Sequence, residues 1–235
     1  MLPNEISIDI YKKILNLKPI GTLELRVMPI FNSIKHEKFK INIPRIITSS
    51  SYKFLNFILG NIQKIFKINF SKSEVKNQKY EKMIRNYYKD NLIQGERSQK
   101  WIRWRYSSKS RINYFLEYIF SGNELIGYIA YREAEKFSLK ILVIMEIVII
   151  KKNIFIELII LLKLISLSIK LKCNLILSLR SIQKNNPLSN PLFPRIPNLF
   201  LPTPLELFII VNNDLSPEIL DIRNWKINMA DLDIF

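Results

Sequence analysis

The alternation of apolar and polar residues divides the chain into predicted helices and strands. Apolar side chains recur every three or four positions from 51 to 66, behind a run of serines suited to capping, which predicts an amphipathic helix. A second, more polar helix is expected over 74–92. From 113 to 132 the period falls to two, and the segment SGNE predicts a turn in the middle. These residues are therefore expected to form an antiparallel hairpin.

The most apolar part of the chain follows this hairpin. The segment LKILVIMEIVII is apolar on both faces, which predicts a central strand. A helix over 152–172 and a strand at NLILSL come next, and this order predicts a right-handed parallel crossover. Further strands are expected at PIGTLELRVMPIF, LFIIV and WKINMA. The fold class predicted is α/β (α+β), with a mixed, mostly antiparallel sheet flanked by helices. Charged residues interrupt the apolar run, so no transmembrane segment is expected.

The segment WIRWRYSSKSRINY, residues 101–114, is both basic and aromatic. Such a run can hold a strand of nucleic acid by stacking bases on its rings, or it can be the junction where a helix leads into a sheet. No recognised nucleic-acid-binding motif accompanies it. The helix-to-sheet junction is therefore the favoured interpretation.

Composition narrows the classes of function. The net charge of +16 suits an anionic partner, although the abundance of Ile, Lys and Asn is also typical of A/T-rich codons. Cys173 and His36 are the only residues of their kinds, which excludes an intrachain disulfide and a Cys/His metal cluster, so no metal is expected. The opening MLPNEISIDI has no basic region leading into an apolar one, so no signal peptide is expected. The predicted location is the cytoplasm.

Four short motifs occur in a recognisable order. They are WIRWRY, then NYFLEYIFSGNELIGYIAYR, then a buried strand with an acid in its middle, and finally NWKINMADLDIF. This order resembles that of the GNAT N-acetyltransferase-like proteins found among bacterial surface-polysaccharide genes. The resemblance extends from about Gln94 to the C-terminus. The matching residues are Trp104, Arg105, Tyr106, Gly127, Tyr128, Trp225, Asp231 and Asp233.

A second resemblance concerns the N-terminal residues. The segment from Tyr11 to Phe31 is similar to the closing helix and strand of another GNAT half, although the usual Leu-Gly-Phe is replaced by ILNL. The resemblance therefore implies a remnant of a preceding GNAT-like half at 1–40, a helical connecting segment at 41–95 and a GNAT-like domain at 96–235. A separate chain that supplies the first half is an expected partner.

The resemblance implies acetyl-CoA or another acyl-CoA as cofactor and an amino sugar or similar small amine as acceptor. GNAT enzymes bind the pyrophosphate with backbone N–H groups of a glycine-bearing turn before a helix. The corresponding stretch here, IIKKNIFIELI, contains no glycine. Lys151, Lys152 and Asn153 are the candidate cofactor-binding residues, and the cofactor turn is expected to be degenerate. A non-catalytic basic module that binds nucleic acid or an anionic membrane surface is the alternative function, with nucleic acid not favoured.

Glu146 is the candidate catalytic residue of this stretch. A carboxylate inside an apolar strand has a raised pKa and suits a general base, or else it is paired with a lysine or arginine of the crossover helix. The resemblance implies splayed strands beside it. Tyr128 is a candidate general acid, with packing as the alternative. The candidate substrate-binding residues are Arg105, Trp225, Asp231 and Asp233, and the last two alternatively form a solvated chain end.

Overall fold

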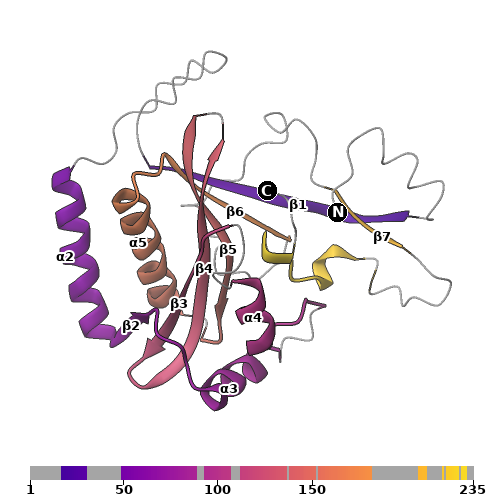
Figure 1. The fold of residues 1–235 in the computed structure, drawn as a ribbon, viewed down its shortest axis with the longest axis horizontal. Helices are drawn as coiled ribbons and strands as arrows, with labels where there is room; N and C mark the ends of the chain where they lie inside the picture. Colours follow the sequence, from indigo (N-terminus) through magenta and orange to yellow (C-terminus); the bar gives the residue numbers. More distant parts are fainter. Residues whose placement is uncertain are drawn as a thin grey trace.

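A seven-stranded sheet in the order β2-β3-β4-β5-β6-β1-β7 organises the protein (Figure 1). Neighbouring strands are antiparallel except β5 and β6, which are parallel, so the predicted fold class is confirmed. The computed structural model describes residues 17–30, 49–88, 93–106, 112–136, 138–151, 153–181, 206–210, 219, 221–227 and 229–231. The strands are β1 (Leu17–Pro29), β2 (Ile68–Ser71), β3 (Tyr114–Ser121), β4 (Glu124–Lys136), β5 (Leu139–Ile149), β6 (Leu175–Ser181) and β7 (Glu206–Ile210).

Helices cover both faces of this sheet. Helices α2 (Ser49–Phe66) and α5 (Ile154–Lys170) pack on one face, where α2 lies outside α5 (Figure 1). Helices α3 (Asn77–Tyr87) and α4 (Gln99–Arg105) pack on the other face, and α3 is shorter than the helix predicted over 74–92. Within the described residues no helix has the length and apolar character needed to cross a bilayer.

The predicted crossover is confirmed. Strand β5 leads through α5 into β6, which lies parallel to it, and four residue pairs join them from Ile141–Leu175 to Ile144–Ser178. Helix α5 begins because the Asn153 side chain accepts the Phe155 N–H at 2.8 Å, which satisfies one of the free amides of the first turn.

The predicted hairpin is also confirmed. Strands β3 and β4 pair from Tyr114–Arg132 to Ser121–Glu124, with a shift in register beyond Ile119.

Gly127 lies where β4 passes β5. A Cβ on Gly127 would come within 2.1 Å of the backbone oxygen of Val148. No side chain fits at this position, because the backbones of β4 and β5 approach too closely there.

Strand β1 belongs to the same sheet as the later strands. Its second half pairs with β6 from Leu23–Ser181 to Pro29–Leu175, and its first half pairs with β7. The boundaries predicted at residues 40 and 95 remain predictions. The strand pairing nevertheless joins residues of the predicted remnant to strands of the predicted GNAT-like domain.

The prediction of a strand at WKINMA is wrong. The described C-terminal residues form two single 3₁₀ turns, η5 (Ile222–Asn224) and η6 (Met229–Asp231), and Trp225 makes only an isolated bridge with Ile93. The Asp221 side chain accepts the Arg223 N–H at 2.9 Å, which caps η5. Met229 and Ala230, the last two residues of the predicted strand, are instead buried as part of the turn η6.

Candidate functional site

Glu146 lies at the centre of a buried polar cluster. Its side chain has no exposed surface, and Arg97 donates from Nε to Glu146 Oε2 at 2.6 Å. The hydroxyls of Tyr106 and Tyr128 donate to Glu146 Oε1 at 2.8 and 3.0 Å. The carboxylate therefore accepts three hydrogen bonds from protein groups, one of them from a cation.

A bulge in β5 decides which face Glu146 occupies. Before it, Ile141 and Val143 face α3 and α4, while Leu142 and Ile144 face α2 and α5. The register between β4 and β5 jumps from Ala130–Glu146 to Tyr131–Ile144, so Met145 is an extra residue. A bulge turns the next side chain onto the opposite face. Glu146 thereby points toward the tyrosines and not into the apolar layer under α5.

Arg97 uses its whole guanidinium in this cluster. Besides Glu146, it donates from Nη2 to Asp231 Oδ1 at 2.7 Å and from Nη1 to the Glu96 carbonyl at 3.0 Å. The guanidinium carbon also lies 4.6 Å from the centre of the Trp101 ring. A Cβ on Gly95 would come within 2.7 Å of Arg97 Nη1, so position 95 has to be occupied by glycine for the guanidinium to lie here. The guanidinium thus joins β5, α4 and η6.

The loop before α4 holds Arg97 in position. The Tyr80 hydroxyl donates to the Arg97 carbonyl at 2.8 Å, and the Arg97 N–H donates to the Tyr88 hydroxyl. The Ser98 side chain then accepts the Trp101 N–H at 3.2 Å and caps α4. The basic and aromatic segment that begins at Trp101 is therefore the end of a short helix before β3, as favoured from the sequence.

Burial raises the pKa values of Glu146, Tyr106 and Tyr128. Desolvation raises the pKa of Glu146, while Arg97 and the hydrogen bond from Tyr106 oppose this rise. Desolvation and the Glu146 charge hold the pKa values of Tyr106 and Tyr128 well above the usual range, so both hydroxyls keep their protons. The two tyrosines are therefore donors to the carboxylate.

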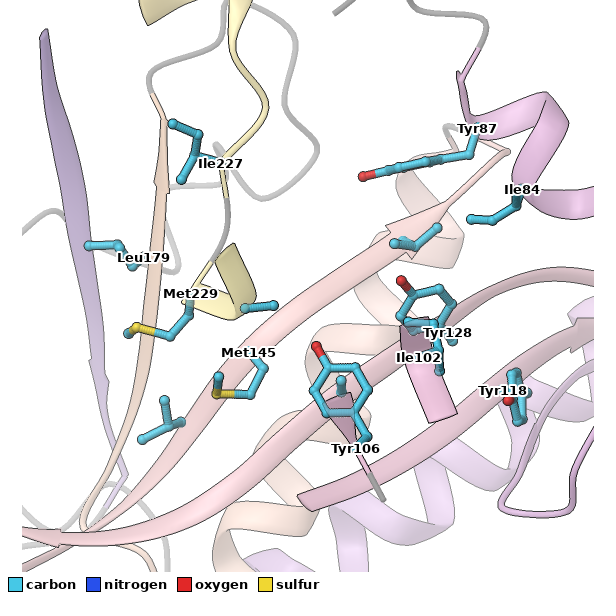
Figure 2. Close-up of a cluster of buried hydrophobic side chains, with 14 of the residues drawn as sticks. Ile84, Tyr87, Ile102, Tyr106, Tyr118, Tyr128, Met145, Leu179, Ile227 and Met229 are labelled. Carbon is cyan, nitrogen blue, oxygen red and sulfur yellow. The ribbon is translucent and has the colours of Figure 1, made fainter. Parts of the chain in front are cut away.

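Asp231 connects the cluster to the surface. Its side chain is 18% exposed, whereas that of Arg97, to which it is paired, is 2% exposed. It ends η6, which contacts both β5 and β6. Met229 of η6 belongs to the same apolar cluster as Met145 and Leu179 (Figure 2). Asp231 is thus the acidic group of the cluster that solvent reaches.

Strands β5 and β6 part next to Glu146. Their shared ladder ends at Ile144–Ser178, although β5 continues to Ile149 and β6 to Ser181. The end of the ladder coincides with the Met145 bulge. Within the described residues β5 therefore pairs with β4 and no longer with β6 from this point on.

The remaining predicted substrate-binding residues are dispersed. Trp225 donates from its indole N–H to the Ile219 carbonyl at 2.8 Å and packs at the edge of the cluster. Arg105 lies with its guanidinium carbon 6.0 Å from the centre of the Tyr114 ring. Asp233 lies outside the described residues.

The residues at the start of α5 do not fit a pyrophosphate. Lys151 is ion-paired with Glu124 at 2.5 Å, and Asn153 uses its side chain to cap the helix. Ile154 and Phe155, which follow, are exposed apolar residues. Lys152 lies outside the described residues. This turn offers bulky side chains in place of the glycine backbone that an acyl-CoA pyrophosphate needs.

A second buried acid, Glu117, was missed from the sequence. It lies on β3 beneath α5, where the Tyr131 hydroxyl donates to it at 2.7 Å and Lys163 of α5 pairs with it at 3.0 Å. A lysine or arginine of the crossover helix was the expected partner of Glu146, but Lys163 of that helix pairs with Glu117, and Glu146 pairs with Arg97. The period-two pattern of the hairpin, in which an acid replaces an apolar residue on the inner face, was the available signal.

Arg97 was missed as well. It lies in the segment GERS, outside the helices and strands predicted from the sequence. A buried acid in β5 requires a cationic partner, but nothing in the sequence distinguishes Arg97 from the other 35 of the 36 lysines and arginines. Among the described residues there is no group of three or more His, Cys, Asp or Glu side chains that could hold a metal.

Comparison with known proteins gives distant likenesses only. No family model and no curated protein matches the chain. A solved GCN5-related N-acetyltransferase from Anabaena variabilis is 11% identical with a TM-score of 0.46, and the similarity covers 88% of this chain and 42% of that one. A protein of unknown function from Enterococcus faecalis, described as a probable N-acyltransferase, is 12% identical with a TM-score of 0.43 over 86% and 40% of the two chains.

A third structure, a functionally unknown conserved protein from Staphylococcus epidermidis, is 11% identical with a TM-score of 0.38, over 75% of this chain and 57% of that one. The chain spans less than half of the first two proteins. Likenesses at these scores assign no function, so the residues of the site have to carry the proposal.

Proposed function

We propose that the chain is the acceptor-binding part of a GNAT-like, acyl-CoA-dependent N-acyltransferase, with a degenerate cofactor turn. The acceptor is an amino sugar or a similar small amine, as in surface-polysaccharide biosynthesis. The observation that carries the proposal is the carboxylate pair Glu146 and Asp231, joined by Arg97 at the point where β5 parts from β6. A partly exposed carboxylate beside the end of this ladder suits an ammonium or amine ligand.

The two carboxylates take different roles in this proposal. Asp231 contacts the acceptor, because part of its side chain is exposed, and it removes the amine's proton toward solvent. Glu146 is a positioning residue: it holds the guanidinium that in turn orients Asp231. Tyr128 positions Glu146 and does not act as an acid, since its raised pKa makes it a poor proton donor to a thiolate.

The direct role of Glu146 as a base is the competing version. It requires η6 to move aside, because the Glu146 side chain has no exposed surface. The two versions differ in the response to E146Q. Loss of a base removes turnover and leaves acceptor binding intact, whereas loss of a positioning residue weakens acceptor binding itself.

Trp225 supplies an apolar wall to the acceptor in this proposal. Its indole is fixed by the hydrogen bond to Ile219, so the ring is held before any ligand arrives. A sugar ring packs well against such a flat apolar surface. The first GNAT half on a separate chain supplies the acyl-CoA in this proposal.

The test is calorimetry on the purified chain with two ligands. We expect a primary amine such as glucosamine to bind, and acetyl-CoA at millimolar concentration to give no binding heat, because the start of α5 lacks a glycine turn. Tight binding of acetyl-CoA would contradict the degenerate turn. Absence of amine binding would overturn the proposed acceptor site.

A further inference from the structure

Exposed apolar residues among those that the structure describes concentrate on two neighbouring helices. Among the described residues, seven of the eight large hydrophobic side chains that are exposed lie on α2 or at the start of α5. From α2 come Phe54, Phe57, Ile65 and Phe66. From α5 come Ile154, Phe155 and Leu158. We call these seven residues the α2–α5 patch, and a cluster of this kind on a protein surface marks an interaction site.

One aromatic contact joins the two helices of the α2–α5 patch at the end of α2. Phe66 at the end of α2 stacks on Phe155 at the start of α5, with ring centres 5.0 Å apart. Phe54, Phe57 and Ile65 are spaced by three and eight residues, so they share one side of α2. Leu59, which is buried, lies on the opposite side and packs toward α5. Helix α2 therefore has a second apolar stripe that faces outward.

Basic residues flank this stripe. Lys53 and Lys64 are exposed and, being eleven residues apart on α2, lie on the same side of it, and the exposed Lys67 follows the helix. Helix α2 contains no Asp or Glu. At the start of α5 the acids are Glu157 and, on the hairpin, Glu124, which is paired with Lys151. The outward face of α2 thus combines aromatic side chains with positive charge.

We propose that the α2–α5 patch docks on an anionic phospholipid surface, with α2 lying parallel to the bilayer plane. Aromatic and aliphatic side chains enter the boundary between headgroups and acyl chains, while lysines contact anionic headgroups. The net charge of +16 attracts the whole chain to such a surface. Charge also decides against a second copy as the occupant, because two such faces would bring lysines against lysines.

This docking surface is independent of the candidate acceptor site. The patch lies on the face of the sheet covered by α2 and α5, and the Glu146 cluster lies on the face covered by α3 and α4. The D231N variant therefore leaves lipid binding unchanged, and loss of lipid binding leaves amine binding unchanged. The two proposals fail separately.

The experiment is cosedimentation of the purified chain with vesicles of phosphatidylcholine, with and without phosphatidylglycerol. We expect binding that requires phosphatidylglycerol and that decreases as salt rises. Phe57→Glu should lower the partition coefficient about tenfold. Ile65→Gln is a milder change at an exposed position and should lower the partition coefficient by a smaller factor. Replacing Lys53, Lys64 and Lys67 by Gln lowers the preference for anionic vesicles about fivefold for each lysine.

The matched control is Trp104→Glu. Trp104 is the remaining one of the eight exposed large hydrophobic residues; it is 69% exposed and lies on α4, on the opposite face of the sheet. This variant should leave vesicle binding unchanged. Equal loss in Trp104→Glu and Phe57→Glu, or no dependence on phosphatidylglycerol, overturns the proposal. A dimer in analytical ultracentrifugation that Phe57→Glu dissociates also overturns it, because the patch then belongs to a second copy.

Discussion

Arg97 and Glu146 are separated by 49 residues in the sequence and form a fully buried ion pair, with Nε 2.6 Å from Oε2. The two residues belong to different kinds of structure. Arg97 comes from an irregular segment before a short helix, and Glu146 comes from the middle of a strand. Their pairing fixes α4 to the sheet and holds Asp231 at the edge of the cluster.

Loss of either partner alone should destabilise the protein strongly. R97A leaves the Glu146 carboxylate buried without its cation, so the free energy of unfolding should fall by about 3–5 kcal/mol. E146A leaves the Arg97 guanidinium with one carboxylate instead of two, and it should also destabilise the protein. Urea unfolding of R97A, E146A and the double variant measures this. The double variant should lose less than the sum of the two single losses.

Lys151 and Glu124 provide the matched control. They form an ion pair at 2.5 Å, but both side chains are about half exposed. The same cycle of alanine variants at these positions should change the free energy of unfolding by at most about 1 kcal/mol. If the Arg97–Glu146 cycle gave an equally small coupling, the pair would not hold the cluster together.

Gly127 and Gly60 should respond in opposite directions to alanine. G127A places a Cβ 2.1 Å from the Val148 oxygen, so β4 and β5 must separate, and we expect a loss of about 2 kcal/mol or more. G60A lies in α2, where a Cβ meets nothing within 4 Å, and alanine favours the helix by about 0.5–1 kcal/mol. Thermal unfolding of both variants checks this, and a destabilised G60A with an unchanged G127A would contradict the strand pairing.

Stability should fall steeply in alkali. Burial raises the folded-state pKa of seven described tyrosines, and that of five of them far above the value of about 10 expected for an unfolded chain, so the folded protein holds protons that the unfolded chain releases. The stability that these protonated hydroxyls provide is therefore fully present below about pH 10 and decreases as the pH rises above that value. The five are Tyr80, Tyr87, Tyr106, Tyr128 and Tyr131.

The absorbance of tyrosinate measures this effect. In the folded protein these five residues should not ionise until the chain unfolds, so tyrosinate should appear in one steep step together with the loss of circular dichroism. In denaturant all tyrosines should titrate gradually. A gradual titration of every tyrosine in the folded protein would show that the cluster is open to solvent.

The thiol of Cys173 should react slowly. The side chain is buried, and burial raises its pKa to about 11, so little thiolate is present at neutral pH. We expect modification by a thiol reagent at pH 8 to be limited by unfolding and to accelerate when urea is added. Immediate modification in the folded state would contradict the packing of α5 against β6.

The elements with local patterns were predictable from the sequence. The hairpin around Gly127 follows from a period of two with a turn, and the crossover from β5 through α5 follows from apolar runs of suitable lengths. The Glu146 cluster was predicted only in part. The acid was evident because its neighbours are apolar, but its face was not, because one bulge residue, Met145, inverts the alternation.

The partners of Glu146 were not predictable for a different reason. A hydrogen bond between residues 49 apart leaves no periodic trace, and Arg97 lies in a segment without regular structure. The strand predicted at WKINMA failed because the Trp225 hydrogen bond to Ile219 and the burial of Met229 and Ala230 in η6 favour local turns over extended pairing. Long-range charge pairing and local side-chain hydrogen bonds both escape an argument based on periodicity.

Asp231 should be required for acceptor binding. D231N keeps the shape of the side chain and removes the charge that an ammonium ligand needs, so binding of glucosamine should weaken about tenfold or more. D221N is the matched control, because Asp221 is paired with the exposed Arg223 at 2.6 Å. It should leave binding unchanged.

The most direct test of the proposed acceptor site is a calorimetric titration that compares glucosamine with N-acetylglucosamine. The two ligands share the sugar ring and differ in the amine. If Asp231 recognises the amine, wild-type protein binds glucosamine, binds the acetylated sugar at least about tenfold more weakly, and loses this difference in D231N. Equal binding of both sugars, or a preference that survives in D231N, would contradict an amine acceptor site at Asp231.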